Sequence, residues 1–216
     1  MATHAQGRIT RARRAELLGG IYVILNDEPR AIELAQAVLA AGVRIVQYRA
    51  KAGISGERVR SLRVLTREHD ALLIMNDDWQ AAFEYDCDGV HLGPDDAGFA
   101  RAAEVRDALG ERLVGLSCGT LHEVRAANAA GADYLGIGSV FATGSKADAG
   151  APIGLGGLRV LAAVSAVPVA AIGGITAATV PSVRSCGAAM VAVISAVAAS
   201  ARPDRAAREL VEAWNA

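Results

Sequence analysis

The sequence has little of what marks several common classes of protein. Aromatic residues make up only 4% of its 216 residues, so a core must be built mainly from Ala, Val, Leu and Ile. The formal net charge is −1, which gives no overall attraction to nucleic acid or to an anionic membrane. No uninterrupted apolar stretch is long enough to span a bilayer. We therefore expect one compact domain that binds small molecules, with neither nucleic acid nor a membrane as a partner.

Cysteine is scarce, and the patterns of common catalytic centres are missing. Cys87, Cys118 and Cys186 are widely spaced and form no CxxC pair, which is typical of reduced, buried thiols in a cytoplasmic protein. Cys118 comes at the end of a predicted strand, so a thiol beside a binding site is a second interpretation. The sequence has no Ser/His/Asp or Cys/His set and no zinc-ligand spacing. His91 lies within a predicted strand and is interpreted as a hydrogen-bonded core residue.

The N-terminus resembles a signal peptide only loosely. Four arginines (positions 8, 11, 13 and 14) precede the apolar stretch from Leu17 to Leu25, but Asn-Asp-Glu-Pro follows where a cleavage site should be. We expect residues 1–10 to be a disordered tail and the next residues to form a short helix that leads into the first strand. The arginines are interpreted as a solvated face of that helix.

Short apolar, β-branched runs alternate along the chain with stretches that carry apolar residues at helical spacing. This alternation predicts parallel βαβ units, and eight units in just over 200 residues predict an α/β protein with a (β/α)8 TIM barrel over residues 11–216. The alternative is a doubly wound open sheet, but the first turn, residues 26–29, lacks the glycine that a phosphate loop there would need. The predicted strands are Ile21–Leu25, Val43–Tyr48, Leu72–Met75, Gly89–His91, Leu113–Leu116, Tyr134–Ile137, Val169–Ile172 and Met190–Ile194.

Cations follow two of the predicted strands at the end where such barrels place their active sites. Gln47, Arg49 and Lys51 share one face if the second strand stays extended that far. Arg offers a planar fork for phosphate oxygens, and Lys adds a point charge. Lys146, after the sixth strand, would add a third cation. For residues 47–51 alone, a solvated strand end with two surface cations is an equal alternative.

Carboxylates follow the third and fourth predicted strands. Asp77 and Asp96 are the candidate metal ligands, because Mg²⁺ is typically held by one or two carboxylates together with substrate phosphates. Cations and carboxylates at one barrel mouth therefore suggest a Mg²⁺–diphosphate substrate. Asp78 is interpreted as a helix cap, and one of Asp95 and Asp96 could likewise serve only as a cap.

A second anion site is predicted after the last two strands. Gly173 and Gly174 precede Thr176, which is expected to start a helix, and glycines there let backbone N–H groups approach a phosphate. Ser195, before the following helix, fits the same role, because barrels often bind a monophosphate in these two loops. A tight turn without a ligand is the alternative. The long segment from Phe141 to Gly157 is expected to act as a lid.

Six motifs follow one another along the predicted strands and their ends: 47–51 (QYRAK), 75–77 (MND), 88–93 (DGVHLG), 136–141 (GIGSVF), 143–146 (TGSK) and 171–175 (AIGGI). In combination, they resemble the thiamine phosphate synthase family. The resemblance implies a (β/α)8 barrel that joins an aminopyrimidine methyl diphosphate to a thiazole phosphate and releases pyrophosphate by a dissociative mechanism. Two alternatives stay open: a paralogue similar to a thiazole tautomerase, which needs no diphosphate or metal site, and a non-catalytic barrel that binds a phosphate ligand.

The resemblance also implies roles for individual residues. It implies Mg²⁺ at Asp77 and Asp96, and catalytic cations at Arg49, Lys51 and Lys146. It implies contacts with the pyrimidine diphosphate from Gln47, Tyr48, Arg49, Ala50, Lys51, Asn76, Ser117 and Lys146. It implies contacts with the thiazole phosphate from Thr143, Ser145, Gly174, Ile194 and Ser195. Pro94 departs from the family pattern, which usually has Gln there. A homo-oligomer is one option that the sequence leaves open.

Overall fold

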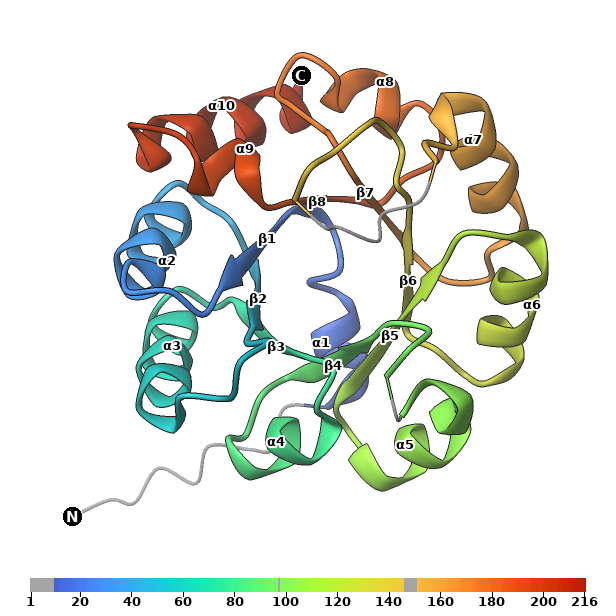
Figure 1. Cartoon of the computed structure of the whole chain (residues 1–216), viewed down its shortest axis with the longest axis horizontal. Coiled ribbons are helices and arrows are strands. Elements are labelled where there is room, and N and C mark those ends of the chain that lie inside the picture. Colours follow the sequence, from blue (N-terminus) through green and yellow to red (C-terminus); the bar gives the residue numbers. More distant parts are fainter. Residues whose placement is uncertain (1–9, 97, 146–150) are drawn as a thin grey trace.

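Eight parallel strands form a closed barrel that is surrounded by helices in this computed structural model (Figure 1). The structure describes residues 10–96, 98–145 and 151–216. The strands pair in sequence order, and the eighth pairs with the first, so that Gly20 faces Met190 and Val23 faces Val193. The (β/α)8 prediction is confirmed, and the open sheet is wrong, because an open sheet would leave two unpaired edges.

The elements alternate as the hydrophobic pattern indicated. The strands are β1 (Gly20–Asn26), β2 (Ile45–Arg49), β3 (Leu72–Asn76), β4 (Gly89–Leu92), β5 (Leu113–Cys118), β6 (Tyr134–Ile137), β7 (Val169–Ile172) and β8 (Met190–Val193). The helices are α1 (Arg11–Ala15), α2 (Ala31–Ala40), α3 (Gly56–Glu68), α4 (Trp79–Glu84), α5 (Ala102–Leu109), α6 (Leu121–Ala129), α7 (Gly154–Val164), α8 (Val180–Arg184), α9 (Ser195–Ala198) and α10 (Pro203–Asn215), with a 3₁₀ turn at Phe99–Arg101.

Two apolar regions hold the barrel together. The larger one lies between the strands and the helices, and aliphatic residues such as Val23, Leu34 and Leu62 are fully buried in it. The smaller one fills the inside of the barrel and includes Tyr22 and Tyr134. These two tyrosines supply large side chains that help to fill the barrel interior.

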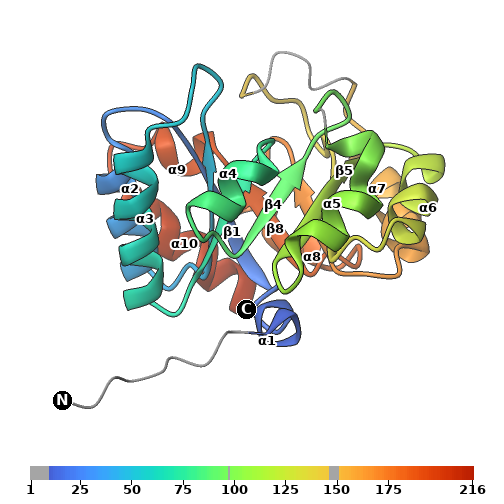
Figure 2. The same ribbon diagram turned by 90° about the horizontal axis from the view of Figure 1, so that it is seen from below.

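Helix α1 lies below the N-terminal ends of the strands, on the side opposite the loops that follow them (Figure 2). Arg14 on this helix is only 7% exposed, and its Nε lies 3.0 Å from Asp88 Oδ1. Arg63 of α3 pairs with the same carboxylate at 2.5 Å. The predicted helix is thus confirmed, but the solvated face is wrong at Arg14, because α1 pairs its arginine with an acid at the start of β4. Residues 1–9, expected to be disordered, lie outside the described residues.

Within the part of the chain that the structure describes, no helix combines the length and the apolar character that crossing a membrane would require.

Candidate active site

A cavity of about 790 Å³ opens at the C-terminal ends of the strands. Every strand contributes to its lining, directly or through the loop that follows it. The structure brings together twelve of the residues predicted from the sequence: Gln47, Arg49, Lys51, Asn76, Asp77, Asp96, Ser117, Thr143, Ser145, Gly174, Ile194 and Ser195.

Two of the predicted residues that the structure describes, Tyr48 and Ala50, do not line the cavity. Tyr48 is fully buried on the outer face of β2, where its Oη accepts a hydrogen bond of 3.2 Å from the Ser55 N–H. Ala50 packs against the same outer core. Both alternate with Gln47 and Arg49, which point inward, as the period of two along a strand requires. Lys146 lies outside the described residues, and so does part of the expected lid.

Two carboxylates meet on one side of the cavity. Asp77 follows β3 with a left-handed φ of +66°, and its Oδ2 lies 2.5 Å from Lys51 Nζ. Desolvation, followed by the hydrogen bond with Asp77, raises the pKa of Asp96 to about 6. The nearby Lys51 ammonium acts in the opposite direction and favours the ionised form of Asp96. Among the described residues no third acidic, histidine or cysteine side chain completes the group.

The loop that carries Asp96 is a tight turn that accommodates the unusual proline. Asp96 N–H donates to the Gly93 carbonyl at 3.1 Å, and the Asp96 carboxylate accepts from the Gly93 N–H at 2.5 Å. Pro94 occupies the second position of this four-residue turn, where proline is favoured. The neighbouring acid Asp95 is exposed. Asp78 accepts from the Ala81 N–H at 2.9 Å and caps α4, which confirms its predicted role.

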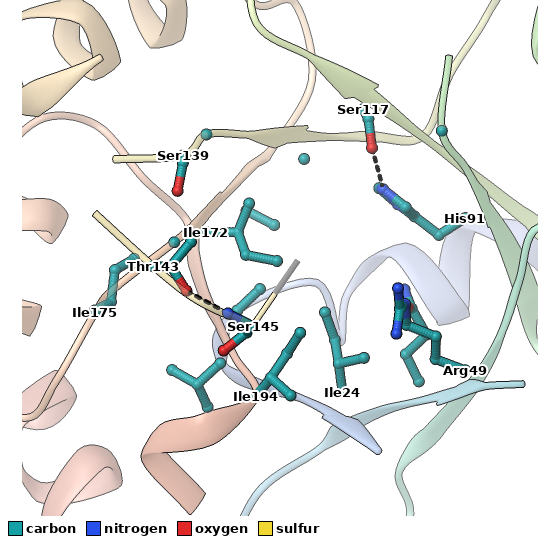
Figure 3. A pocket seen from close by; sticks show the side chains of 18 of the residues that line it. Ile24, Arg49, His91, Ser117, Ser139, Thr143, Ser145, Ile172, Ile175 and Ile194 are labelled. Atoms are coloured by element: carbon teal, nitrogen blue, oxygen red, sulfur yellow. Dashed lines mark hydrogen bonds between the residues drawn. The ribbon is translucent and has the colours of Figure 1, made fainter. Parts of the chain in front are cut away.

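The opposite wall of the cavity carries hydroxyls and glycines. Figure 3 shows Thr143, Ser145 and Ile194 facing the side that carries Arg49, Ser117 and His91. The hydroxyls of Ser145 and Ser195 lie 3.0 Å apart, although the two residues are distant in sequence.

Two glycines bring the loops after β6 and β7 together on this wall. Gly173 and Gly174 have φ values of +105° and +63°. A Cβ at Gly173 would lie 2.0 Å from Ser139 Oγ, and one at Gly174 would lie 2.5 Å from the Ala142 carbonyl. Glycine is therefore required at both positions by backbone conformation and by space.

The prediction of a helix that starts at Thr176 is wrong. The Thr176 N–H donates to Thr179 Oγ1 at 3.0 Å within a turn, and α8 begins only at Val180. The Val180 N–H donates to the Thr176 carbonyl at 3.1 Å, so a single turn does begin at Thr176, but Pro181 has no N–H with which to continue it. Gly174 nevertheless lines the cavity, so the turn reaches the site without a helix directly behind it.

The sequence did not single out Tyr22 as a site residue, and it assigned His91 to the core. Both line the cavity, and His91 is hydrogen-bonded to Tyr134 at 3.2 Å and to Ser117 at 3.0 Å. The histidine is thus hydrogen-bonded as predicted, but it faces the site. The period-two pattern of β1, which places Tyr22 and Ile24 on one face, could have identified the tyrosine.

Cys118 lies beside the cavity but is poorly suited to nucleophilic chemistry. It is 3% exposed, and desolvation raises the pKa of its thiol to about 12. The thiol is buried, as expected for all three cysteines, and the second interpretation also fits, because Cys118 lines the cavity. At neutral pH, however, a thiol with this pKa is almost entirely protonated, and the thiolate is the nucleophilic form.

Comparison with known proteins gives one consistent result. The family model for thiamine monophosphate synthase matches residues 21–197. The thiamine-phosphate synthase of Moorella thermoacetica is 44% identical over 151 residues, which cover 66% of this chain and 70% of that protein. The thiamine-phosphate synthase of Bacillus mycoides is 37% identical over 160 residues, with 70% and 71% covered.

The solved structures agree. Thiamine phosphate pyrophosphorylase from Pyrococcus furiosus superimposes with a TM-score of 0.83 at 36% identity, covering 92% of this chain and 96% of that one. A 3-hexulose-6-phosphate synthase matches with a TM-score of 0.68 at 22% identity over 90% of this chain and 99% of that one. The second likeness shows the shared barrel fold alone.

Proposed function

The chain belongs to the thiamine monophosphate synthase family and is a transferase of thiamine biosynthesis, and we propose in detail how its cavity performs the reaction. The reaction joins 4-amino-2-methyl-5-(diphosphooxymethyl)pyrimidine to thiazole phosphate and gives thiamine phosphate and pyrophosphate. One observation supports this most directly: a single cavity is lined by cations and carboxylates from β2 to β4 and their loops, and by glycines and hydroxyls from the loops after β6, β7 and β8. The volume of about 790 Å³ is within the range of pockets that hold drug-sized ligands.

The wall formed by β2, β3 and β4 binds the diphosphate. Arg49 is held by a hydrogen bond of 3.0 Å from its Nη1 to Asn26 Oδ1, which leaves the other nitrogens of the guanidinium to phosphate oxygens. Lys51 donates to Asp77 and lies beside the same space. Lys146 is the third cation of this proposal, and Asn76 adds an amide. Together these groups stabilise the charge that develops on the leaving pyrophosphate.

The acidic pair fits a hard divalent cation. Desolvation and the hydrogen bond with Asp77 raise the pKa of Asp96 to about 6, so this carboxyl gives up its proton less readily than an ordinary aspartate, and a bound metal would replace that proton. Two carboxylates with substrate phosphates and water are a usual Mg²⁺ environment. Bound there, Mg²⁺ would neutralise part of the diphosphate charge. The Lys51 ammonium, which lies 2.5 Å from Asp77 Oδ2, would then be available to the substrate.

The remaining chemistry needs positioning rather than a covalent intermediate with the protein. Departure of pyrophosphate leaves a pyrimidine methyl cation that the ring amino group stabilises, and the thiazole nitrogen then attacks. Gln47 and Ser117 contact the pyrimidine in this arrangement, and Thr143, Ser145, Gly174, Ile194 and Ser195 hold the thiazole phosphate. Fixing both partners in one cavity supplies the favourable geometry on which the rate depends. The segment after Thr143 keeps water away from the cation.

Neither of the two alternative functions would use all the charged groups that line this cavity. A thiazole tautomerase would use only the phosphate wall, and it would leave the Lys51–Asp77–Asp96 group without a role. A phosphate-binding protein without activity would leave the same group unexplained. A cytoplasmic location and a homo-oligomer remain predictions, which fractionation and size-exclusion chromatography with light scattering would test.

The test is an assay for pyrophosphate. With both substrates and Mg²⁺, the protein should release pyrophosphate in stoichiometric proportion to thiamine phosphate. Omission of the thiazole phosphate or addition of excess chelator should reduce release to background. A folded protein that releases no pyrophosphate with both substrates and Mg²⁺ would contradict the proposal. Isomerisation of a thiazole carboxylate phosphate by that same protein would favour the tautomerase.

A further inference from the structure

A chain of four hydrogen bonds crosses the inside of the barrel at the inner end of the cavity. Gln47 Nε2 lies 2.6 Å from Tyr22 Oη, which lies 3.0 Å from Tyr134 Oη. Tyr134 Oη lies 3.2 Å from His91 Nδ1, and His91 Nε2 lies 3.0 Å from Ser117 Oγ (Figure 3). Both ends of this chain line the cavity, whereas its centre, Tyr134, is fully buried. The network thus joins two substrate-facing side chains on β2 and β5.

The barrel reserves space for the two central rings. A Cβ at Gly115 would lie 2.2 Å from the Tyr134 ring, and a Cβ at Gly136 would lie 2.8 Å from His91 Cε1. The register places Gly115 between His91 on β4 and Tyr134 on β6. The Tyr134 ring packs against the imidazole with centroids 5.5 Å apart, and against Tyr22 edge-on at 6.1 Å. Any side chain at these glycines would displace the network.

The network determines whether Gln47 and Ser117, its two ends, present a hydrogen-bond donor or an acceptor to the cavity. Burial raises the pKa of both Tyr22 and Tyr134, so each phenol keeps one proton to donate. The Gln47 amide donates to Tyr22. Either phenol can donate in the bond between Tyr22 and Tyr134, and in the direction assigned here the Tyr22 proton goes to Tyr134 and the Tyr134 proton goes to His91 Nδ1. The neutral imidazole then donates from Nε2 to Ser117. Gln47 is left with a carbonyl acceptor for the ligand, and Ser117 is left with an O–H donor.

We propose that Tyr22, Tyr134 and His91 are positioning residues that fix Gln47 as an acceptor and Ser117 as a donor for the aminopyrimidine. This inference rests on the proposed function. A 4-aminopyrimidine offers an N–H donor on its amino group and acceptors on its ring nitrogens, which matches one acceptor and one donor in the wall. A 4-oxo pyrimidine would place its carbonyl oxygen next to the carbonyl oxygen of Gln47, and two acceptors form no hydrogen bond. If the network is broken, the Gln47 side chain is free to rotate, and its amide N–H can then donate a hydrogen bond to the 4-oxo group.

The experiment compares two ligands that differ only at this position. Dissociation constants are measured by calorimetry for the 4-amino and 4-oxo forms of 2-methyl-5-(phosphooxymethyl)pyrimidine, with Mg²⁺ and without thiazole phosphate. Wild type should prefer the 4-amino compound. Tyr22→Phe and Tyr134→Phe should each reduce this preference at least about fivefold, the size of one hydrogen bond. Tyr85→Phe, which removes a phenol at the end of α4, is the matched control and should leave the preference unchanged.

A merely structural role gives a different result. Equal weakening of both ligands, or an unchanged preference in both network variants, overturns the inference. The two variants break the same hydrogen bond from opposite sides, so either one suffices if the other does not fold. If wild type releases pyrophosphate in the full assay and the variants keep its preference, the inference alone fails. If wild type neither releases pyrophosphate nor prefers the 4-amino compound, the proposed function fails and the inference with it.

Discussion

Asp96→Asn should remove activity and, without metal, make the fold more stable. Desolvation and the hydrogen bond with Asp77 raise the pKa of Asp96 from 3.8 to about 6. A difference of this size corresponds to about 3 kcal/mol, and screening in the open cavity reduces it to about 1 kcal/mol. Asparagine has the same shape and cannot ionise, so it avoids this cost. Its carbonyl oxygen can still accept from the Gly93 N–H.

The pH dependence follows from the direction of the shift. Because the folded pKa lies above the unfolded pKa, the stability that this carboxyl contributes is complete below about pH 4 and is lost as the pH rises through about 6. Without Mg²⁺, Asp96→Asn should therefore be about 1 kcal/mol more stable than wild type near pH 7.5, and the difference should vanish near pH 4. Added Mg²⁺ should stabilise wild type more than the variant, since it binds the folded carboxylate pair.

Activity should change in the opposite direction. Loss of one of the two proposed ligands should reduce pyrophosphate release by about 10²–10³-fold at saturating substrates. The control is Asp95→Asn, because Asp95 is the exposed neighbour in the same turn, and its activity should change less than about twofold. Urea unfolding at both pH values and the pyrophosphate assay give the two readouts. The reasoning is refuted if the two variants lose equal activity, or if Asp96→Asn is the less stable protein near pH 7.5 without Mg²⁺.

Three further substitutions or reactions probe the structure around the site. Asp88→Asn should lower the free energy of unfolding in urea by about 3–5 kcal/mol, because it leaves two buried guanidiniums without their shared carboxylate. Asp204→Asn removes a carboxylate that is only partly buried and should cost less than about 0.5 kcal/mol, and equal costs would contradict the burial argument. Gly173→Ala should lower the free energy of unfolding by about 1–3 kcal/mol, because φ is +105° there and Ser139 leaves no space for a Cβ. Gly144→Ala is the control and should be nearly neutral, since no atom lies within 4 Å of a Cβ at that position. A neutral Gly173→Ala would disprove the close approach of Ser139 to Gly173. With its pKa raised to about 12, the Cys118 thiol should react with Ellman's reagent near pH 8 only after unfolding, and rapid modification of Cys118 in the native protein would contradict this assignment.

Much of the fold could be predicted because strands buried on both faces must be continuous apolar runs. The predicted starts of strands and helices were less accurate where local hydrogen bonding extends or delays a helix. The strand predicted from Val43 begins at Ile45, because the Val43 N–H still bonds to the Val38 carbonyl and closes α2. The late start of α8 has a local origin too, because Pro181 has no N–H to donate to the Ala177 carbonyl.

The site could be predicted in part for a similar reason. Alternation along β2 placed Gln47 and Arg49 on the inner face, and the barrel brings Asp77 and Asp96 from neighbouring strands to the same mouth. The network that supports this site was missed. Tyr22 and Tyr134 are 112 residues apart, and their hydroxyls meet only because β1 and β6 face each other across a closed barrel.

The sequence by itself determined the number and order of the strands and the chemistry at their C-terminal ends. Each depends on a local pattern: the period of two, the apolar run, and the polar residues that follow it. Only the tertiary structure decided that Arg14 is buried against Asp88, that Asp77 and Asp96 share a hydrogen bond, and that His91 belongs to the site. These contacts depend on the stagger and closure of eight strands, which sets distances across the barrel that no local pattern contains.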